Sequence, residues 1–193
     1  MEINLFDVFL EPNRRVYWVF ILSSVVIILF VGKKLFTKRF LMHQSTRFDA
    51  LYFVVMLFMI PALILPLLPD LKLISWSVMQ FLERNFGFVQ VVSWNRFEIA
   101  LAYTISLFIV SDFSRYLLHY AMHKVPFLWR VHQFHHSANR LNPLTFYRVH
   151  PIENFLFGLR YVLVMGIVSG IYLYFFKASV HLLDIMGVNL FVF

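Results

Sequence analysis

Long uncharged apolar runs constrain the fold of this chain more than any other feature of its sequence. Residues 16–32 and 50–69 contain no charged side chain, and residues 97–123 and 154–176 are also largely apolar. As helices at about 1.5 Å per residue, runs of this length can span a bilayer's hydrocarbon core. With 61% hydrophobic and 14% charged residues and a mean hydropathy of +0.75, the chain is not an ordinary soluble globule. We predict an all-α integral membrane bundle with about four transmembrane helices.

The stretches between these runs predict shorter elements. Residues 71–95 mix apolar and charged side chains, which indicates an amphipathic or re-entrant piece on the far side of the membrane. Residues 128–137 predict a helix at the membrane surface, and the proline-punctuated residues 139–151 predict a loop. Residues 179–193 predict the start of another apolar helix, and a GxxxG pattern at 166–170 permits close helix packing but is common in apolar stretches.

Histidines cluster at the end of the third apolar run and in the segment before the fourth. His119 and His123 form H-x3-H, and His132, His135 and His136 form H-x2-H-H. Residues three and four apart share one face of a helix, so each group presents converging imidazoles that suit a metal ion. The spacing does not name the metal, because neutral imidazole binds iron, zinc, copper and nickel alike. The chain has no cysteine, so any transition-metal site must use His, Asp or Glu.

Two further residues are linked to the cluster by position. Asp112 shares a helical stripe with His119 and His123, and metal-bound imidazoles commonly donate their other N–H to a carboxylate. Asp112 is therefore predicted to orient a ligand; the alternative is a helix-end acid that faces water or Arg115. On spacing alone His150 is a loop histidine, and the isolated His43 and His181 are interpreted as ordinary polar residues.

The motifs together resemble the fatty acid hydroxylase / sterol desaturase superfamily over roughly the second half of the chain. The resemblance lies in D-x6-H-x3-H, then P-x-L-W-x2-H-x2-H-H-S, then R-x-H-P-x-E, formed here by Asp112, His119, His123, Pro126, Leu128, Trp129, His132, His135, His136, Ser137, Arg148, His150, Pro151 and Glu153. Members of the superfamily are membrane enzymes with a non-haem di-iron centre held almost wholly by histidines. They use O2 and electrons to hydroxylate, desaturate or oxidatively cleave lipids.

The resemblance implies the activity, cofactors and partners of this chain. It implies two iron ions, O2 as co-substrate, an external electron donor, and C–H oxidation of a lipid or sterol. The implied catalytic iron ligands are the five clustered histidines, with His150 as a further ligand: His119, His123, His132, His135, His136. The expected partners are a membrane lipid and a redox protein of the reductase, cytochrome b5 or ferredoxin type, and the pattern allows a homo-oligomer.

Charge predicts the topology. The net charge of +7 comes from basic residues between the apolar runs, where orientation and lipid head groups explain it better than nucleic acid. Lysine and arginine concentrate in residues 33–47, which places that loop and the histidine region on the cytoplasmic side of a bacterial inner membrane or the endoplasmic reticulum. We divide the chain into an N-terminal membrane hairpin with a connecting segment, residues 1–96, and a histidine-box domain, residues 97–193.

The sequence also predicts that this chain is an N-terminal fragment. Its last residues lie within an apolar run that has no stop signal, and the superfamily carries further histidine clusters that have no counterpart here. We therefore expect the histidine-box domain to be incomplete at its C-terminus and the fragment to be inactive.

Three other functions compete with the oxygenase. A membrane zinc hydrolase of the H-E-x2-H type needs a glutamate base between its histidines, but residues 120–122 are Tyr, Ala and Met. A metal-binding or metal-transport protein without redox catalysis is the main alternative, although transporters place ionisable groups along a path in mid-membrane. A bis-histidine haem protein uses single histidines on facing helices, which the H-x2-H-H group does not suit.

Overall fold

The computed structural model describes residues 22, 26, 42–88, 94–139, 141, 143–177, 184–185 and 188–189. Two compact units divide the chain: residues 45–181 form one, and residues 1–44 with 182–193 form the other. Apart from Leu22 and Val26, the predicted apolar span 16–32 lies outside the described residues, as does His181. The predicted domain boundary at residues 96 and 97 stays a prediction.

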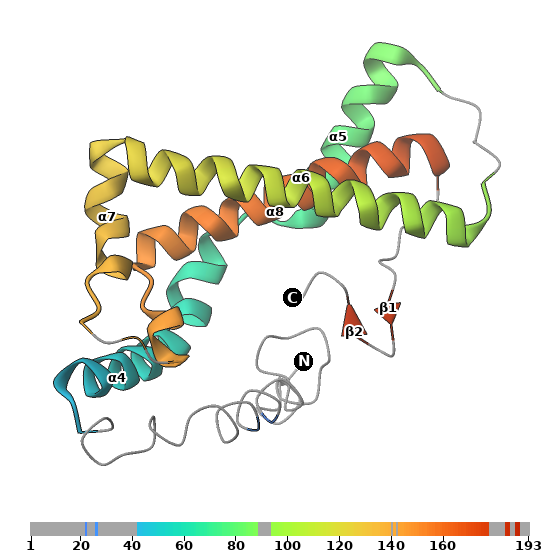
Figure 1. Cartoon of the computed structure of the whole chain (residues 1–193). Coiled ribbons are helices and arrows are strands. Elements are labelled where there is room, and N and C mark those ends of the chain that lie inside the picture. The colour runs from blue at the N-terminus through green and yellow to red at the C-terminus, as the bar shows by residue number, and fades with distance from the viewer. Residues whose placement is uncertain are drawn as a thin grey trace. The chain divides into compact units, whose positions relative to one another are not determined.

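The unit of residues 45–181 is built from helices, which confirms the predicted all-α class (Figure 1). Its α-helices are α4 (Gln44–Met59), α5 (Leu71–Phe86), α6 (Arg96–Lys124), α7 (Pro126–His136) and α8 (Pro151–Phe176). Three helical segments of the described chain are long and apolar enough to cross a membrane: Gln44–Phe86, Arg96–Lys124 and Pro151–Phe176. The predicted helices over 97–123, 128–137 and 154–176 are therefore present, each within a few residues of its expected bounds.

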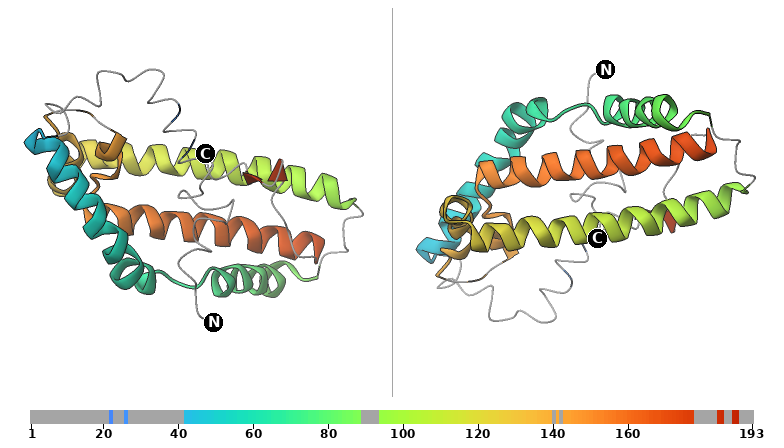
Figure 2. Two further views of the ribbon diagram at one scale, coloured as in Figure 1. Left: turned by 90° about the horizontal axis from the view of Figure 1, so that it is seen from below. Right: turned by 90° about the horizontal axis from the view of Figure 1, so that it is seen from above.

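The helices α6 and α8 lie side by side and run in opposite directions (Figure 2). Two hydrogen bonds join their apolar faces: the hydroxyls of Tyr103 and Ser169 are 2.7 Å apart, and those of Ser106 and Tyr172 are 2.8 Å apart. Leu107 is 1% exposed at this contact. Hydroxyl pairs of this kind satisfy polar groups in a hydrocarbon environment, where water cannot do so. The α6–α8 pair therefore forms the long axis of the unit.

The segment from α4 to α5 is a helix that is interrupted at its prolines. After α4 the backbone passes through a π-helical turn, Ile60–Ile64, and a 3-10 turn, Leu65–Leu67. Prolines at 61, 66 and 69 cause the break, because proline removes a backbone donor and disfavours the helical conformation before it. The helix restarts at Asp70, whose carboxylate accepts a hydrogen bond from the amide of Lys72 at 2.6 Å.

The interpretation of residues 71–95 as an amphipathic or re-entrant piece on the far side stays a prediction. Residues 71–86 form α5, which packs along α8 and continues the candidate span that starts at Gln44. The interpretation rests on Lys72, Glu83 and Arg84, which interrupt the apolar pattern. Lys72 lies in the first turn of α5, and Glu83 and Arg84 lie in the last, where charged groups can reach beyond an apolar layer.

Two glycines allow the close approach of α8 to α5. A Cβ atom built on Gly166 would lie 2.5 Å from the side chain of Ile74, and one on Gly170 would lie 2.6 Å from the backbone oxygen of Ser75. The GxxxG pattern thus marks a real helix contact in this chain. The contact seats α8 between α5 and α6.

The described residues of the other unit include two short strands. Asp184–Ile185 (β1) and Val188–Asn189 (β2) pair antiparallel, with Asp184 opposite Asn189. The prediction of a helix over 179–193 is wrong for these residues. Glycine at position 187 and the branched side chains of Ile185 and Val188 disfavour a helix and favour strand pairing.

The histidine-bearing elements gather at one end of the residue 45–181 unit. The start of α4, the end of α6, all of α7 and the start of α8 meet there, as both views of Figure 2 show. The connection between α6 and α7 is the single residue Val125, which has an extended backbone and is followed by Pro126 at the first position of α7. This sharp corner turns α7 back toward the last turns of α6.

We expect Gly170→Ala to destabilise the unit, because its methyl group would meet the backbone of α5, which cannot move aside. The free energy of unfolding should fall by about 1–3 kcal/mol, the usual cost of overpacking a close contact. Gly158→Ala is the matched control, since its Cβ would meet only the flexible side chain of Leu68, at 3.1 Å. Thermal unfolding in detergent compares the two variants, and equal losses would contradict the close-contact explanation.

Candidate metal centre

The two histidine groups come from two helices that meet at the Val125 corner. On α6, the Nε2 atoms of His119 and His123 are 3.1 Å apart, and on α7 those of His132 and His136 are also 3.1 Å apart. Each pair is four residues apart on its helix, so the helical repeat alone brings its rings together. The structure thus confirms that each histidine group converges.

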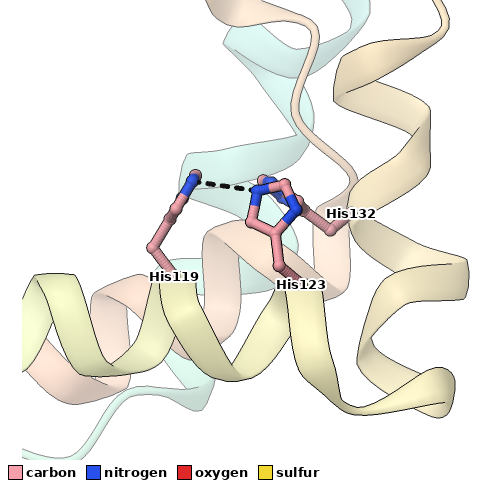
Figure 3. A group of neighbouring side chains, drawn as sticks. All are labelled: His119, His123 and His132. Carbon is pink, nitrogen blue, oxygen red and sulfur yellow. Dashed lines mark hydrogen bonds between the residues drawn. The ribbon is translucent and has the colours of Figure 1, made fainter.

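The corner then brings the two pairs together. The ring centroid of His132 lies 4.8 Å from that of His119 and 4.7 Å from that of His123. One nitrogen from each of these three rings lies within 4.8 Å of the other two, so the three could hold one metal ion. Figure 3 shows the three side chains pointing toward one another. His136 joins them, with its ring centroid 5.1 Å from that of His123.

Two histidine rings of the cluster are held by hydrogen bonds from their Nδ1 atoms to acceptors on α8 and on the loop before it. The Nδ1–H of His132 donates to the Glu153 carboxylate at 2.9 Å, and that of His135 donates to the Arg148 carbonyl oxygen at 3.2 Å. A neutral imidazole with its proton on Nδ1 carries its lone pair on Nε2. These bonds therefore select the form of each ring that can bind a metal through Nε2.

Glu153 is the carboxylate that contacts the cluster, and the sequence reasoning gave it no role. It lies in the first turn of α8, is 3% exposed, and one of its oxygens, Oε2, is buried without a hydrogen-bond partner. A buried carboxylate oxygen without a donor is costly, which suits a position beside positive charge. Glu153 and Arg148 both belong to the R-x-H-P-x-E motif, which is the sequence feature that could have identified them as site residues.

The other predicted site residues lie outside the converging group. Asp112 is exposed on α6 and makes no hydrogen bond to a histidine among the described residues, so its orienting role stays a prediction. His150 caps the start of α8: its Nδ1 accepts from the amide of Ile152 at 3.2 Å. That bond leaves the ring proton on Nε2 in the neutral form, and His150 as a ligand also stays a prediction. His43 is half-buried near the start of α4.

The donor set fits a transition-metal ion. Two nitrogens that each lie about 2.0–2.1 Å from one ion at ordinary ligand angles are about 3 Å apart. Both Nε2 pairs have this spacing, at 3.1 Å. All five donors are imidazoles, which suit iron, zinc, copper and nickel rather than calcium or magnesium.

The cluster favours uncharged rings. Burial lowers the pKa of His132, and the charges of His123 and His135 lower it further. Burial and neighbouring imidazolium charges likewise lower the pKa of His136. Rings that are neutral near pH 7 have lone pairs available for a metal.

Helices long enough to span a membrane end here in a cluster of imidazoles that could hold a metal ion. Residues 104–191 match the model of the fatty acid hydroxylase family. The family comprises oxidoreductases that use a histidine-ligated di-iron centre. Comparisons with curated proteins and with solved structures found no match to the chain.

We expect Glu153→Ala to weaken metal binding by about 10–100-fold, the usual effect of removing a group that orients a ligand. The loss would leave the Nδ1–H of His132 without its acceptor. Asp112→Ala is the comparison variant, and it should bind metal more weakly than the wild type only if Asp112 also orients a ligand. Titration of the metal-free protein with Fe²⁺ under anaerobic conditions measures both; a loss in Asp112→Ala alone would transfer the orienting role to Asp112.

In the metal-free protein, His136 should contribute stability that is lost as the pH falls through about 6.5, the ordinary pKa of histidine. Because the folded pKa of His136 lies below that value, the unfolded chain binds more protons at this residue, and its contribution to the free energy of unfolding rises with pH. Thermal unfolding in detergent at about pH 7.5 and 5.5 compares the wild type with His136→Asn. The Tm of His136→Asn relative to that of the wild type should be higher at about pH 5.5 than at about pH 7.5, and an equal difference at both pH values would exclude this origin.

Proposed function

We propose that this chain forms an O2-dependent oxidoreductase site of the lipid hydroxylase or desaturase type, with a histidine-ligated di-iron centre. The observation that carries the proposal is the convergence of His119 and His123 on α6 with His132 on α7, inside the segment that matches the fatty acid hydroxylase family. His136 pairs with His132, and His135 lies beside both. The hydrogen bonds to His132 and His135, which direct their Nε2 lone pairs, support a metal-binding role rather than a structural one.

The iron ligands in this proposal are His119, His123, His132, His135 and His136. When bound, the di-iron centre would supply O2 activation with two electrons from a donor and two protons from water, so that a lipid C–H becomes C–OH and the second oxygen atom leaves as water. The chain's own part is to hold the ligands and orient them. Glu153 keeps the His132 proton on Nδ1, and the Arg148 carbonyl does the same for His135.

A surface depression with polar and apolar lining lies beside the histidines and gives a substrate access to them. It has a volume of about 290 Å³ and is lined by His135, His136, Ala138, Leu141, Thr145 and Phe146. Leu141 and Phe146 are 80% and 63% exposed, so an apolar surface borders the ligands at this end of the unit. We infer that a lipid approaches the metal centre from this side.

The membrane orientation in this proposal places the histidine end in the cytoplasm. The basic stretch at residues 33–47 extends into the first turn of α4, which lies at the same end of the unit as the histidines. The positive-inside rule then supports the cytoplasmic side, where a redox protein could deliver electrons. His119 and His123 are exposed at that end, which supports access by such a partner.

The test is iron content and lipid oxidation by the detergent-purified chain, wild type against His135→Ala. We expect iron in the wild type, and the variant should lose most of its iron and all oxygen-dependent conversion of added lipids, followed by mass spectrometry. His43→Ala is the matched control, because that histidine is half-buried outside the cluster. Zinc alone, or no metal, in protein produced with both metals present would contradict the di-iron assignment and favour a metal-binding or transport function.

A further inference from the structure

A buried acidic residue outside the family match lies behind the metal centre. Asp49, in the second turn of α4, is 1% exposed. Its Oδ1 lies 3.1 Å from Nη1 of Arg148, and its Oδ2 accepts from the hydroxyl of Thr145 at 2.9 Å. A carboxylate taken out of water is stable only with such partners. Asp49 therefore holds the segment between α7 and α8 against α4.

Arg148 is fixed by more than this ion pair. Its Nη2 donates to the hydroxyl of Ser137, at the end of α7, at 2.9 Å. Its guanidinium carbon lies 4.7 Å from the ring centroid of Phe48 and 5.3 Å from that of Phe134, within the range of cation–π attraction. The planar group is thus held between α4 and α7, so the backbone of residue 148 has little freedom to shift.

The backbone of the same residue reaches the metal centre. The Arg148 carbonyl oxygen accepts the Nδ1–H of His135, and the next carbonyl, that of Val149, accepts from the hydroxyl of Tyr52 on α4 at 2.7 Å. The orientation of the His135 ring therefore depends on where α4 holds residues 148 and 149. Charge adds to the effect, because the Asp49 carboxylate offsets the Arg148 cation beside a site that must accept a metal cation.

We propose that Asp49 is a positioning residue for the metal ligand His135 and acts on it through Arg148. This inference rests on the proposed function, because it takes His135 to be a metal ligand. It extends the metal site to α4, which lies before the residues that match the family. Without the carboxylate, the Arg148 carbonyl would no longer be held in place, and the His135 ring would lose its fixed direction.

The experiment uses Co²⁺ as the probe, added to the detergent-purified, metal-free full chain. Asp49→Asn keeps the side chain's size but removes its charge, and we expect about tenfold weaker Co²⁺ binding with an altered visible absorption spectrum. Glu83→Gln is the matched control: it breaks the ion pair with Lys177 at the opposite end of α8 and should leave both Co²⁺ readouts unchanged. A general loss of stability would affect both variants, whereas a positioning role affects only the first.

A double variant shows whether the effect passes through His135. In a His135→Ala background, Asp49→Asn should cause no further loss of Co²⁺ affinity, and losses that multiply would overturn the proposal. Unchanged binding by Asp49→Asn alone, with weakened binding by His135→Ala, would also overturn it while leaving the proposed function intact. If His135→Ala binds Co²⁺ like the wild type, His135 is not a metal ligand, and the proposed function is contradicted at this residue.

Where Asp49→Asn does not fold, judged by its helical circular dichroism, Thr145→Val replaces it. That variant removes one hydrogen bond to Asp49 and keeps the ion pair with Arg148. We expect a smaller loss of Co²⁺ affinity, about two- to threefold, below the effect of removing a directly bonded group. Wild-type affinity in Thr145→Val would count against the proposal.

Discussion

The seating of α8 between α5 and α6 is the packing contact on which the rest of this structure depends. Glycines let α8 approach α5 closely, and paired hydroxyls join it to α6. These contacts fix where α8 begins, and its first turn carries Glu153 against His132. In a hydrocarbon environment, small residues and hydroxyl pairs replace the hydrophobic drive that joins helices in water. The position of Glu153 beside the histidines thus depends on contacts in the second half of α8, far from the histidines themselves.

The histidine cluster could be predicted from local spacing. The residues that hold it in place come from distant parts of the chain and could not be predicted in this way. The H-x3-H and H-x2-H-H patterns imply converging rings because neighbours on one helix are fixed by the helical repeat. Glu153 and Arg148 contact histidines 21 and 13 residues away, and Asp49 reaches Arg148 across 99 residues. Spacing carries no information on such pairs, so Asp112 on the same helix was the more obvious candidate for orienting a ligand.

The apolar runs predicted helices well and their boundaries less well. The long helices over 97–123 and 154–176 appear as α6 and α8, because their composition leaves no alternative in a bilayer. After the prolines the apolar pattern is interrupted, and it did not indicate that α5 packs along α8. Hydropathy records the composition of a segment but not the neighbour that covers it.

The short corner at Val125 has a consequence for how the site is built during folding. All five converging histidines lie on α6 and α7, so the cluster forms as soon as these consecutive helices dock. Closing so short a connection costs little chain entropy. Glu153 and Arg148, which come later in the chain, can join only once α8 is in place. The order of synthesis therefore presents the ligands before the groups that fix their proton positions, and a metal ion can itself guide the docking of α8.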